Sequence, residues 1–135
     1  MNYWLMKSDP ETYSFNDLKR DRRTTWDGVR NPQALQSLRT MKMGDNVLIY
    51  HSGEDKAVVG LAEIVSDPYA DPNQSDPKWA VVDVKIKRIL DKPIPLATIK
   101  ADKAFTGFGL VRNSRLSVMP VPPTLWEKLL AMSDA

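Results

Sequence analysis

The sequence predicts a mixed α+β domain, in which three or four short helices pack around a small barrel of five or six strands. Short apolar runs typical of strands recur along the 135 residues, and segments with helical spacing lie between them. Ten prolines and six glycines separate these runs, which implies short elements and many connections. Because no internal repeat divides it, a chain of this length is expected to form one domain, residues 1–135.

The N-terminal segment predicts a buried strand followed by a short helix. Residues 3–6 form a continuous apolar run, and Pro10 ends the strand because proline cannot donate to a ladder. Ser14 stands at the N-cap of the helix, and Asp17 follows three residues later, which is the spacing of a capping box. Lys7 is then expected at the strand end, where residues of binding sites often collect.

A dense basic cluster and a turn follow the first helix. Four of the five residues 19–23 are basic. Two interpretations remain open for them: a solvated loop, which is the usual behaviour of a charge run, or a contact with phosphate groups. The sequence from Trp26 to Gly28 then predicts a turn.

The second helix is predicted to begin at Asn31, which is a favoured N-cap residue, with Pro32 at the first helical position. Apolar residues recur at helical spacing and form one buried face, namely Ala34, Leu35, Leu38 and Met41. Gly44 follows and can adopt the left-handed conformation of a helix C-cap. The helix is therefore expected to end just before this glycine.

The middle of the chain predicts three further strands, at residues 47–50, 57–65 and 79–89. Gly60 inside the second of them is typical of a bulge or of a close backbone approach. Clean alternation over residues 82–86 predicts one face in the core and the other in water, and residues 91–95 are expected to end that strand. The loop 67–77, with three prolines, is long enough to be either functional or mobile.

The C-terminal third predicts short helical segments around one last strand. Residues 95–100 can form one or two helical turns, and the two phenylalanines of residues 105–109 are expected to plug the space between layers rather than to contact a ligand. Residues 115–119 alternate and predict the last strand. A final helix should run to Met132, with a buried side formed by Leu125, Trp126, Leu129 and Leu130.

Composition excludes several classes of site. The chain has no cysteine and a single histidine, so disulfides, thiolate chemistry and multi-histidine metal sites are excluded, and we expect no metal and no cofactor. The formal net charge of +2 is mildly basic, which allows a polyanion to approach. With neither an apolar run of about 20 residues nor the layout of a signal peptide, we expect a cytoplasmic protein without a membrane partner.

The sequence gives little support for an enzyme. His51 and Ser52 are adjacent, so on a strand they point to opposite faces, and no Gly-x-Ser-x-Gly elbow is present. The Gly107-Phe108-Gly109 segment lacks the rest of a nucleotide-binding fingerprint, and scattered acids do not define a glycosidase pair. A binding module is therefore the favoured class.

One stretch combines the features of a binding pocket. It begins with the polar turn at Trp26 and ends at the polar strand end formed by Tyr50, His51 and Ser52. A helix folded back on its following strand would bring these ends together into a pocket that suits a flat, polar ligand such as a nucleobase. Two alternatives stay open: Trp26 either stacks on the ligand or is buried, and His51 either contacts the ligand or is a satisfied structural histidine.

Six motifs, taken in order, resemble those of the EVE domain, a PUA-like family related to the YTH domains that read methylated adenine in RNA. They are Tyr3-Trp4-Leu5-Met6-Lys7-Ser8-Asp9-Pro10, Trp26-Asp27-Gly28-Val29-Arg30-Asn31, Gly44-Asp45, Tyr50-His51-Ser52, Val59-Gly60-Leu61-Ala62-Glu63-Ile64 and Leu110-Val111-Arg112-Asn113-Ser114-Arg115-Leu116-Ser117-Val118. The resemblance covers nearly the whole chain. It implies a PUA-like pseudo-β-barrel of about six strands with flanking short helices, and a pocket for a modified base.

The resemblance also implies the residues of that pocket. Carried over to this sequence, they are Lys7, Ser8, Trp26, Val29, Arg30, Asn31, Tyr50, His51, Ser52, Arg112, Ser114 and Arg115. A second aromatic wall would have to come from Tyr69 or a neighbour in the long loop, and Asp9 stands where the family often has glutamate. As in YTH domains, Trp26 would form a wall of the cage.

The resulting prediction is a non-enzymatic, monomeric module that recognises a modified base in DNA or RNA, with modified cytosines as the leading candidates. The alternative is a binder of a free nucleoside or another small planar metabolite. Salt separates the two, because polynucleotide binding releases counterions and weakens steeply with ionic strength, whereas binding of a neutral nucleoside does not.

Overall fold

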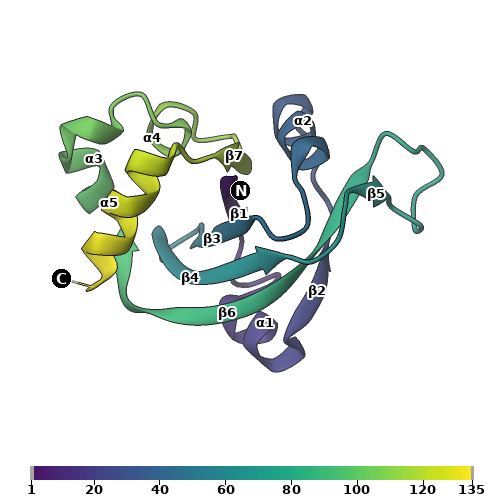
Figure 1. Ribbon diagram of the computed structural model, residues 1–135, viewed down its shortest axis with the longest axis horizontal. Coiled ribbons are helices and arrows are strands. Elements are labelled where there is room, and N and C mark those ends of the chain that lie inside the picture. Colours follow the sequence, from purple (N-terminus) through teal and green to yellow (C-terminus); the bar gives the residue numbers. More distant parts are fainter. Residues whose placement is uncertain (1, 135) are drawn as a thin grey trace.

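The computed structural model describes residues 2–134 and has one strongly curled sheet (Figure 1). Its strands are β1 (Tyr3–Ser8), β2 (Arg23–Trp26), β3 (Asn46–His51), β4 (Ala57–Ile64), β5 (Tyr69–Ala70), β6 (Ala80–Pro95) and β7 (Val118–Pro120). Its helices are α1 (Phe15–Asp21), α2 (Pro32–Thr40), α3 (Leu96–Ala101), the 3-10 turn η1 (Lys103–Phe105), α4 (Gly109–Arg112) and α5 (Pro123–Asp134). The predicted α+β class is confirmed, and within residues 2–134 the sheet has the predicted six strands in its main path with the short β5 as a seventh.

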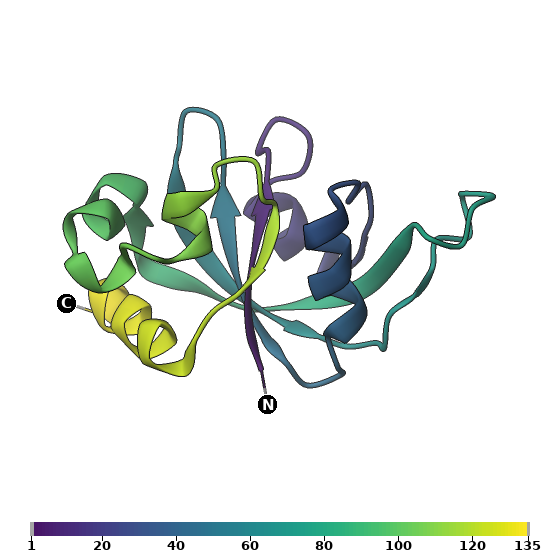
Figure 2. The same ribbon diagram turned by 90° about the horizontal axis from the view of Figure 1, so that it is seen from above.

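The order of strands in the sheet is β2-β6-β4-β3-β1-β7, and β5 pairs separately with β6. All ladders are antiparallel except that between β1 and β3, which is parallel. The long strand β6 bends across the whole molecule, α3, α4 and α5 gather at one end of it, and α1 and α2 lie on opposite sides of the sheet (Figures 1 and 2). The loop after β5 projects away from the body in both views.

The core fills the curl of the sheet. As predicted, β1 is buried on both faces, and Leu5 and Met6 have no exposed surface. Phe105 is fully buried and its ring lies 5.8 Å from that of Phe108, so the predicted aromatic plug is confirmed. Trp126 on α5 stacks on Tyr3 with ring centroids 4.5 Å apart, which ties the last helix to the first strand.

Gly60 lies at a bulge, as its place in a strand predicts. The ladders of β4 with both β3 and β6 shift register beside it, and a Cβ built on Gly60 would lie 2.2 Å from two atoms of the Phe15 ring. The missing side chain therefore makes room for the first residue of α1 on the sheet. The predicted bulge is present, and the close neighbour is the side chain of Phe15 rather than a backbone segment.

The predicted N-caps are present, and the predicted C-cap is not. Ser14 and Asp17 form both bonds of a capping box, and the Asn31 side chain accepts from two amides of α2. Gly44 has a positive φ of 97°, but α2 already ends at Thr40 and is capped by Met41 in an extended conformation. Gly44 serves the following turn instead, where its N–H donates to Ile64.

Three predicted boundaries are wrong. Trp26 ends strand β2 rather than opening a turn, because residues 23–26 find partners on β6, with Trp26 opposite Val82. Residues 19–21 belong to α1 rather than to a loop. Strand β6 continues to Pro95 instead of ending near residue 91. Residues 90–93 form a bulge between the pairs Gly60–Ile89 and Val58–Ile94. Because bulge residues do not donate to the ladder, Pro93 is tolerated there.

The last strand also begins later than predicted. Residues 109–112 form the short helix α4, and Asn113 Oδ1 accepts the N–H of Arg115 in the turn that follows. The strand is therefore confined to Val118–Pro120, beside β1. None of the helices within residues 2–134 is long and apolar enough to cross a bilayer.

Candidate functional site

The parallel pair β1 and β3 brings five predicted site residues together at one edge of the sheet. Lys7 lies opposite Tyr50, Ser8 lies opposite His51, and the Ser52 N–H donates to the Ser8 carbonyl at 3.0 Å. Strands that run in the same direction end side by side, which is why two polar strand ends far apart in the sequence meet here. This part of the predicted cluster is present.

A cavity of about 420 Å³ opens beside this edge, between the end of β1 and strand β2. Three predicted residues line it, namely Lys7, Ser8 and Trp26. Six others complete its wall: Asp9, Thr12, Tyr13, Thr24, Thr25 and Asp27. Its volume lies within the range of small-molecule sites. We refer to it as the β1–β2 cavity.

The turn between β1 and α1 forms one rigid wall of this cavity. The Asp9 carbonyl accepts from the backbone N–H of both Thr12 and Tyr13, at 3.0 and 2.8 Å, and the Ser8 hydroxyl donates to the Tyr13 carbonyl. Tyr13 in turn donates its hydroxyl to Asp21 at the end of α1, at 2.8 Å. The wall is therefore held by bonds to the turn itself and to the helix that follows.

Trp26 is both buried and accessible at one edge. Its side chain is only 8% exposed, so most of the ring belongs to the core. Its indole nitrogen has no hydrogen-bond partner among residues 2–134, yet no buried side-chain nitrogen in this part of the chain is left unpaired. The indole N–H is therefore open to solvent, in a residue that lines the cavity.

Burial also acts on the titratable groups at the cavity. It lowers the pKa of Lys7, whose ammonium donates to the Ser114 carbonyl at 3.0 Å and lies 5.8 Å from the centre of the Tyr50 ring. It raises the pKa of Tyr13, while a hydrogen bond with Thr24 works in the opposite direction. Ser114 thus contacts the predicted cluster through its backbone carbonyl, which accepts from Lys7.

His51 has the contacts of a structural histidine. Its Nε2 accepts the backbone N–H of Phe15 at 2.9 Å, so the proton lies on Nδ1, which donates to Asp55 at 3.0 Å. The side chain is buried and does not line the cavity. Its Nε2 holds the start of α1, and through it the turn that carries Tyr13, while the bond from Nδ1 to Asp55 orients the ring.

Residues 29–31 lie beyond the cavity wall. Val29 is 5% exposed and belongs to the core, while the Asn31 side chain caps α2. The Arg30 guanidinium carbon lies 4.3 Å from the centre of the Trp79 ring, and the Lys78 ammonium lies 4.7 Å from the same ring. Arg30 thus belongs to a cationic surface around Trp79 rather than to the β1–β2 cavity.

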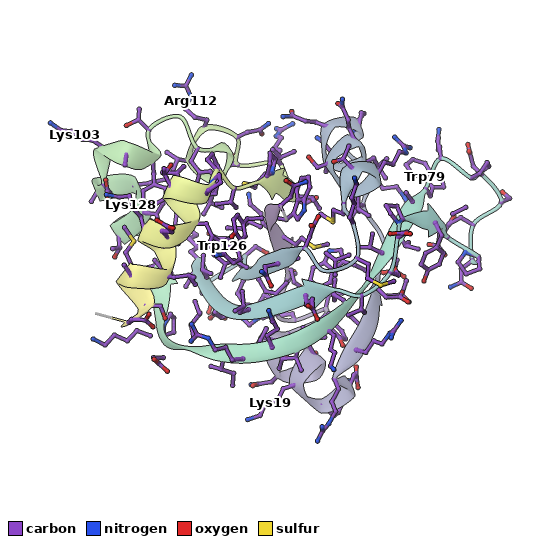
Figure 3. All side chains as sticks on the ribbon, in the orientation of Figure 1. Lys19, Trp79, Lys103, Arg112, Trp126 and Lys128 are labelled. Carbon is purple, nitrogen blue, oxygen red and sulfur yellow. The ribbon has the colours of Figure 1, made fainter. Side chains whose placement is uncertain are left out.

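The remaining predicted residues are also placed outside the cavity. Arg112 is exposed at the end of α4, on the opposite side of the molecule from Lys19 (Figure 3), and Arg115 is exposed in the following turn. Tyr69 donates its hydroxyl to Asp83 at 2.7 Å on the outer face of β6. Burial raises the pKa of Asp83. Hydrogen bonds from Tyr69, Arg23 and Thr25 outweigh burial and hold this pKa below its usual value.

The aromatic partner of Trp26 in the cavity is therefore Tyr13, which the sequence did not single out. Its place between the strand end at Ser8 and the N-cap at Ser14 is the one available signal, since a residue there cannot lie far from either. Asp9, Thr12, Thr24, Thr25 and Asp27 were missed as well. Short polar residues beside turns are common, so nothing in their type distinguishes them.

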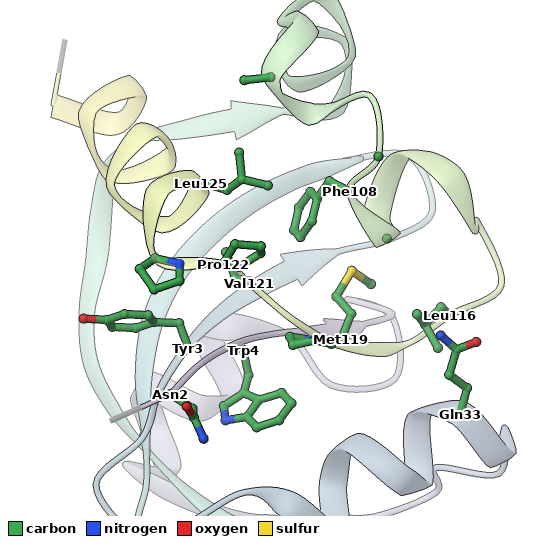
Figure 4. A pocket seen from close by; sticks show the side chains of 15 residues that line it. Asn2, Tyr3, Trp4, Gln33, Phe108, Leu116, Met119, Val121, Pro122 and Leu125 are labelled. Carbon is green, nitrogen blue, oxygen red and sulfur yellow. The ribbon is translucent and has the colours of Figure 1, made fainter.

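A second, larger cavity of about 740 Å³ lies between α2, β7 and α5 (Figure 4). Its lining contains no charged side chain and includes Trp4, Phe108, Met119 and Leu125, with Asn2 and Gln33 as polar members. None of the predicted site residues borders it. Residues 2–134 contain no group of histidine, aspartate and glutamate side chains that could hold a metal ion.

Comparisons with known proteins identify one domain family over nearly the whole chain. Residues 2–132 match the EVE domain family model. Thymocyte nuclear protein 1 of Mus musculus is 37% identical over an alignment 167 positions long, which covers 98% of this chain and 74% of that protein.

Two solved structures are similar over nearly the full length. A protein of Rhodopseudomonas palustris is 36% identical with a TM-score of 0.94, covering 99% of this chain and 94% of that one. The human THYN1 protein, solved in complex with DNA containing 5-methylcytosine, is 32% identical with a TM-score of 0.90, covering 100% and 99%. These likenesses confirm the predicted PUA-like pseudo-barrel.

Proposed function

This chain belongs to the EVE domain family, and we propose that it is a binding module, not an enzyme, for a modified base in nucleic acid. The human relative in complex with DNA that contains 5-methylcytosine supports DNA as the partner and that base as the first candidate. RNA and other base modifications remain within the proposal. We also propose that the protein acts in the cytoplasm as a monomer.

The β1–β2 cavity is the observation that carries this proposal. It has the size for one base and offers an accessible edge of Trp26 opposite polar groups. A base that leaves its stack loses a few kcal/mol, which stacking on an aromatic side chain and edge hydrogen bonds can restore. A methyl group adds only about 0.8 kcal/mol of apolar burial, so preference for a methylated base depends on a close fit.

Cations near the cavity support a polynucleotide partner. Arg30 follows Asp27 by three residues, so it lies at most about 11 Å along the chain from the cavity wall. Around Trp79 it is joined by Lys78, whose carbonyl accepts from Arg39 at 2.6 Å. Neither arginine has a carboxylate partner within residues 2–134, so both are available to phosphates.

The basic cluster of residues 19–23 contributes less than its charge implies. Arg20 pairs with Asp17 and Asp21 at 3.1 and 2.8 Å, and Arg23 pairs with Asp83 at 3.1 Å. Only Lys19 and Arg22 of this cluster have no ion pair within the described part of the chain. The cationic surface around Trp79 is thus the better candidate for phosphate contacts.

Binding to matched oligonucleotides tests the proposal. Fluorescence anisotropy is measured with short single-stranded and duplex DNA and with RNA, each carrying one 5-methylcytosine or one cytosine at the same position. We expect tighter binding of the methylated member in at least one nucleic-acid class. Equal affinity for both members in every class would refute recognition of this modification.

The alternative ligand is a free nucleoside. Titration with 5-methyl-2′-deoxycytidine at two salt concentrations separates the two cases, because only the oligonucleotide releases counterions. Salt-independent binding of the nucleoside with an affinity equal to that of the oligonucleotide would favour the metabolite binder.

A further inference from the structure

The β1–β2 cavity holds many polar side chains, but most of them are already engaged. The Ser8 hydroxyl donates to the Tyr13 carbonyl, and the Tyr13 hydroxyl donates to Asp21. The Lys7 ammonium donates to the Ser114 carbonyl. These groups shape the cavity, and a ligand would have to break their bonds to use the same protons.

Two further members of the wall are engaged as well. The Thr25 hydroxyl donates to Asp83 at 3.0 Å, which turns it toward the outer face of β6. Asp9 Oδ1 accepts the backbone N–H of Glu11 at 2.9 Å. Asp9 is therefore part of the turn that supports the cavity.

Three cavity side chains have no hydrogen-bond partner within residues 2–134. They are the Asp27 carboxylate, the indole N–H of Trp26 and the hydroxyl of Thr12. Asp27 also forms no ion pair among these residues. A carboxylate is an acceptor only, an indole N–H is a donor only, and a hydroxyl is both.

This set, an acceptor next to donors, complements the hydrogen-bonding edge of a base that carries an exocyclic amino group beside a ring acceptor, as cytosine and adenine do. Cytosine presents one donor, its exocyclic N4 amino group, next to two acceptors, N3 and O2. Thymine and uracil present an acceptor at that first position, and guanine does too, so a carboxylate there repels them. Methylation at C5 leaves the cytosine edge unchanged.

We propose that Asp27 is the residue that selects the base: its carboxylate accepts from the exocyclic amino group, while Trp26 and Thr12 donate to the acceptors beside it. The cavity thereby favours a base with an exocyclic amino group, and 5-methylcytosine is distinguished from thymine, which carries the same methyl group. This assignment rests on the proposed function of the cavity.

The test compares two oligonucleotides that differ in one base. Each is a short single strand with one central base, either 5-methylcytosine or thymine, so that the methyl group is constant and the C4 substituent changes from amino to oxo. Wild-type protein should bind the first at least about 10-fold more tightly, since one good edge contact distinguishes bases by about that factor. Anisotropy titration measures both affinities.

Asp27→Asn is the decisive variant. It keeps the shape of the side chain but gives it an NH2 group, which can donate to the thymine oxygen. We expect the preference for 5-methylcytosine over thymine to fall to about 2-fold or less. Because Asp27 is exposed and has no partner in the folded chain, the variant should fold normally, which circular dichroism checks.

Asp9→Asn is the matched control, because Asp9 lines the same cavity but is engaged by the turn. Its preference should stay within about 2-fold of that of the wild type. A full preference retained in Asp27→Asn, or lost only in Asp9→Asn, would overturn the role of Asp27 and leave modified-base binding intact. Failure of the wild type to bind either oligonucleotide would overturn the proposed function, and this inference with it.

Discussion

Replacement of Gly60 by alanine is a direct test of how α1 is seated on the sheet. Gly60 lies in β4 without a positive φ, so alanine is compatible with its backbone conformation. The obstacle is steric: the new Cβ would lie 2.2 Å from two atoms of the Phe15 ring and 2.6 Å from a third. The variant therefore changes one contact and little else.

The size of the effect follows from these distances. Carbon atoms pack at about 3.5 Å or more, so the ring must retreat by about 1.3 Å, the difference between 3.5 and 2.2 Å. Phe15 is 4% exposed and its N–H is bound to His51, so the retreat disturbs packed groups. Overpacking of this kind costs about 1–3 kcal/mol, and the stiffer unfolded chain returns about 0.4–1 kcal/mol. We expect a net loss of about 1–2 kcal/mol in the free energy of unfolding.

Urea denaturation followed by tryptophan fluorescence measures this loss. Gly107→Ala is the matched control, since nothing lies within 4 Å of its built Cβ and its φ is not positive, and its stability should be unchanged or slightly higher. Phe15→Leu should relieve the clash, so that the double variant is more stable than the sum of the two single losses. Equal stability of Gly60→Ala and wild type would refute the reasoning.

Three other changes test the site. Trp26→Leu leaves a smaller apolar side chain and removes the indole N–H that is proposed to donate to the base, so affinity for the methylated oligonucleotide should fall by about 1 kcal/mol in anisotropy titrations while the circular dichroism spectrum is unchanged. His51→Ala leaves the Phe15 N–H unpaired and should lower the free energy of unfolding by about 1–3 kcal/mol in urea, with His51→Gln closer to wild type. Arg30→Ala should lower the slope of log K against log salt by about 1, whereas Arg23→Ala, which removes an ion-paired side chain, should not.

Each of these expectations has an opposite result that contradicts it. Unchanged affinity in Trp26→Leu would make the ring purely structural. Turnover of a nucleotide by the wild type that disappears in His51→Gln would contradict a binding module, because an amide cannot replace a general base. An equal salt slope for Arg30→Ala and wild type would remove the surface around Trp79 from the phosphate contacts.

Local signals in the sequence predicted the features that depend on local contacts. The capping box at Ser14 and the proline after Asn31 fix helix starts through bonds within three residues, and both helices begin there. Strand β2 was missed because its residues are polar or mixed and find their partners on β6, nearly sixty residues later. Its last residue, Trp26, was assigned to the turn because Gly28 follows it so closely.

The candidate site shows the same difference between residues fixed by local contacts and residues brought in by distant ones. Lys7 and Ser8 were predicted because they follow an apolar strand, and they do line the β1–β2 cavity. The opposite wall, with Tyr13 and Asp27, depends on the curl of the whole sheet, which no short pattern encodes. Tyr69 was predicted as a second aromatic wall from its place in a long loop, but its hydroxyl is bound to Asp83.

The position of the β1–β2 cavity in the strand order has a thermodynamic consequence. β1 forms its ladders with β3 and β7, and β2 forms its ladder with β6, so the cavity lies where the curled sheet comes back on itself without a ladder between these two strands. A ligand that contacts both walls links two edges that the backbone leaves separate. At a concentration of 100 times its Kd it adds about 2.7 kcal/mol to the free energy of unfolding. Amide hydrogen exchange in β2 and α1 should then slow as the ligand binds, because separation of β1 from β2 requires release of the ligand.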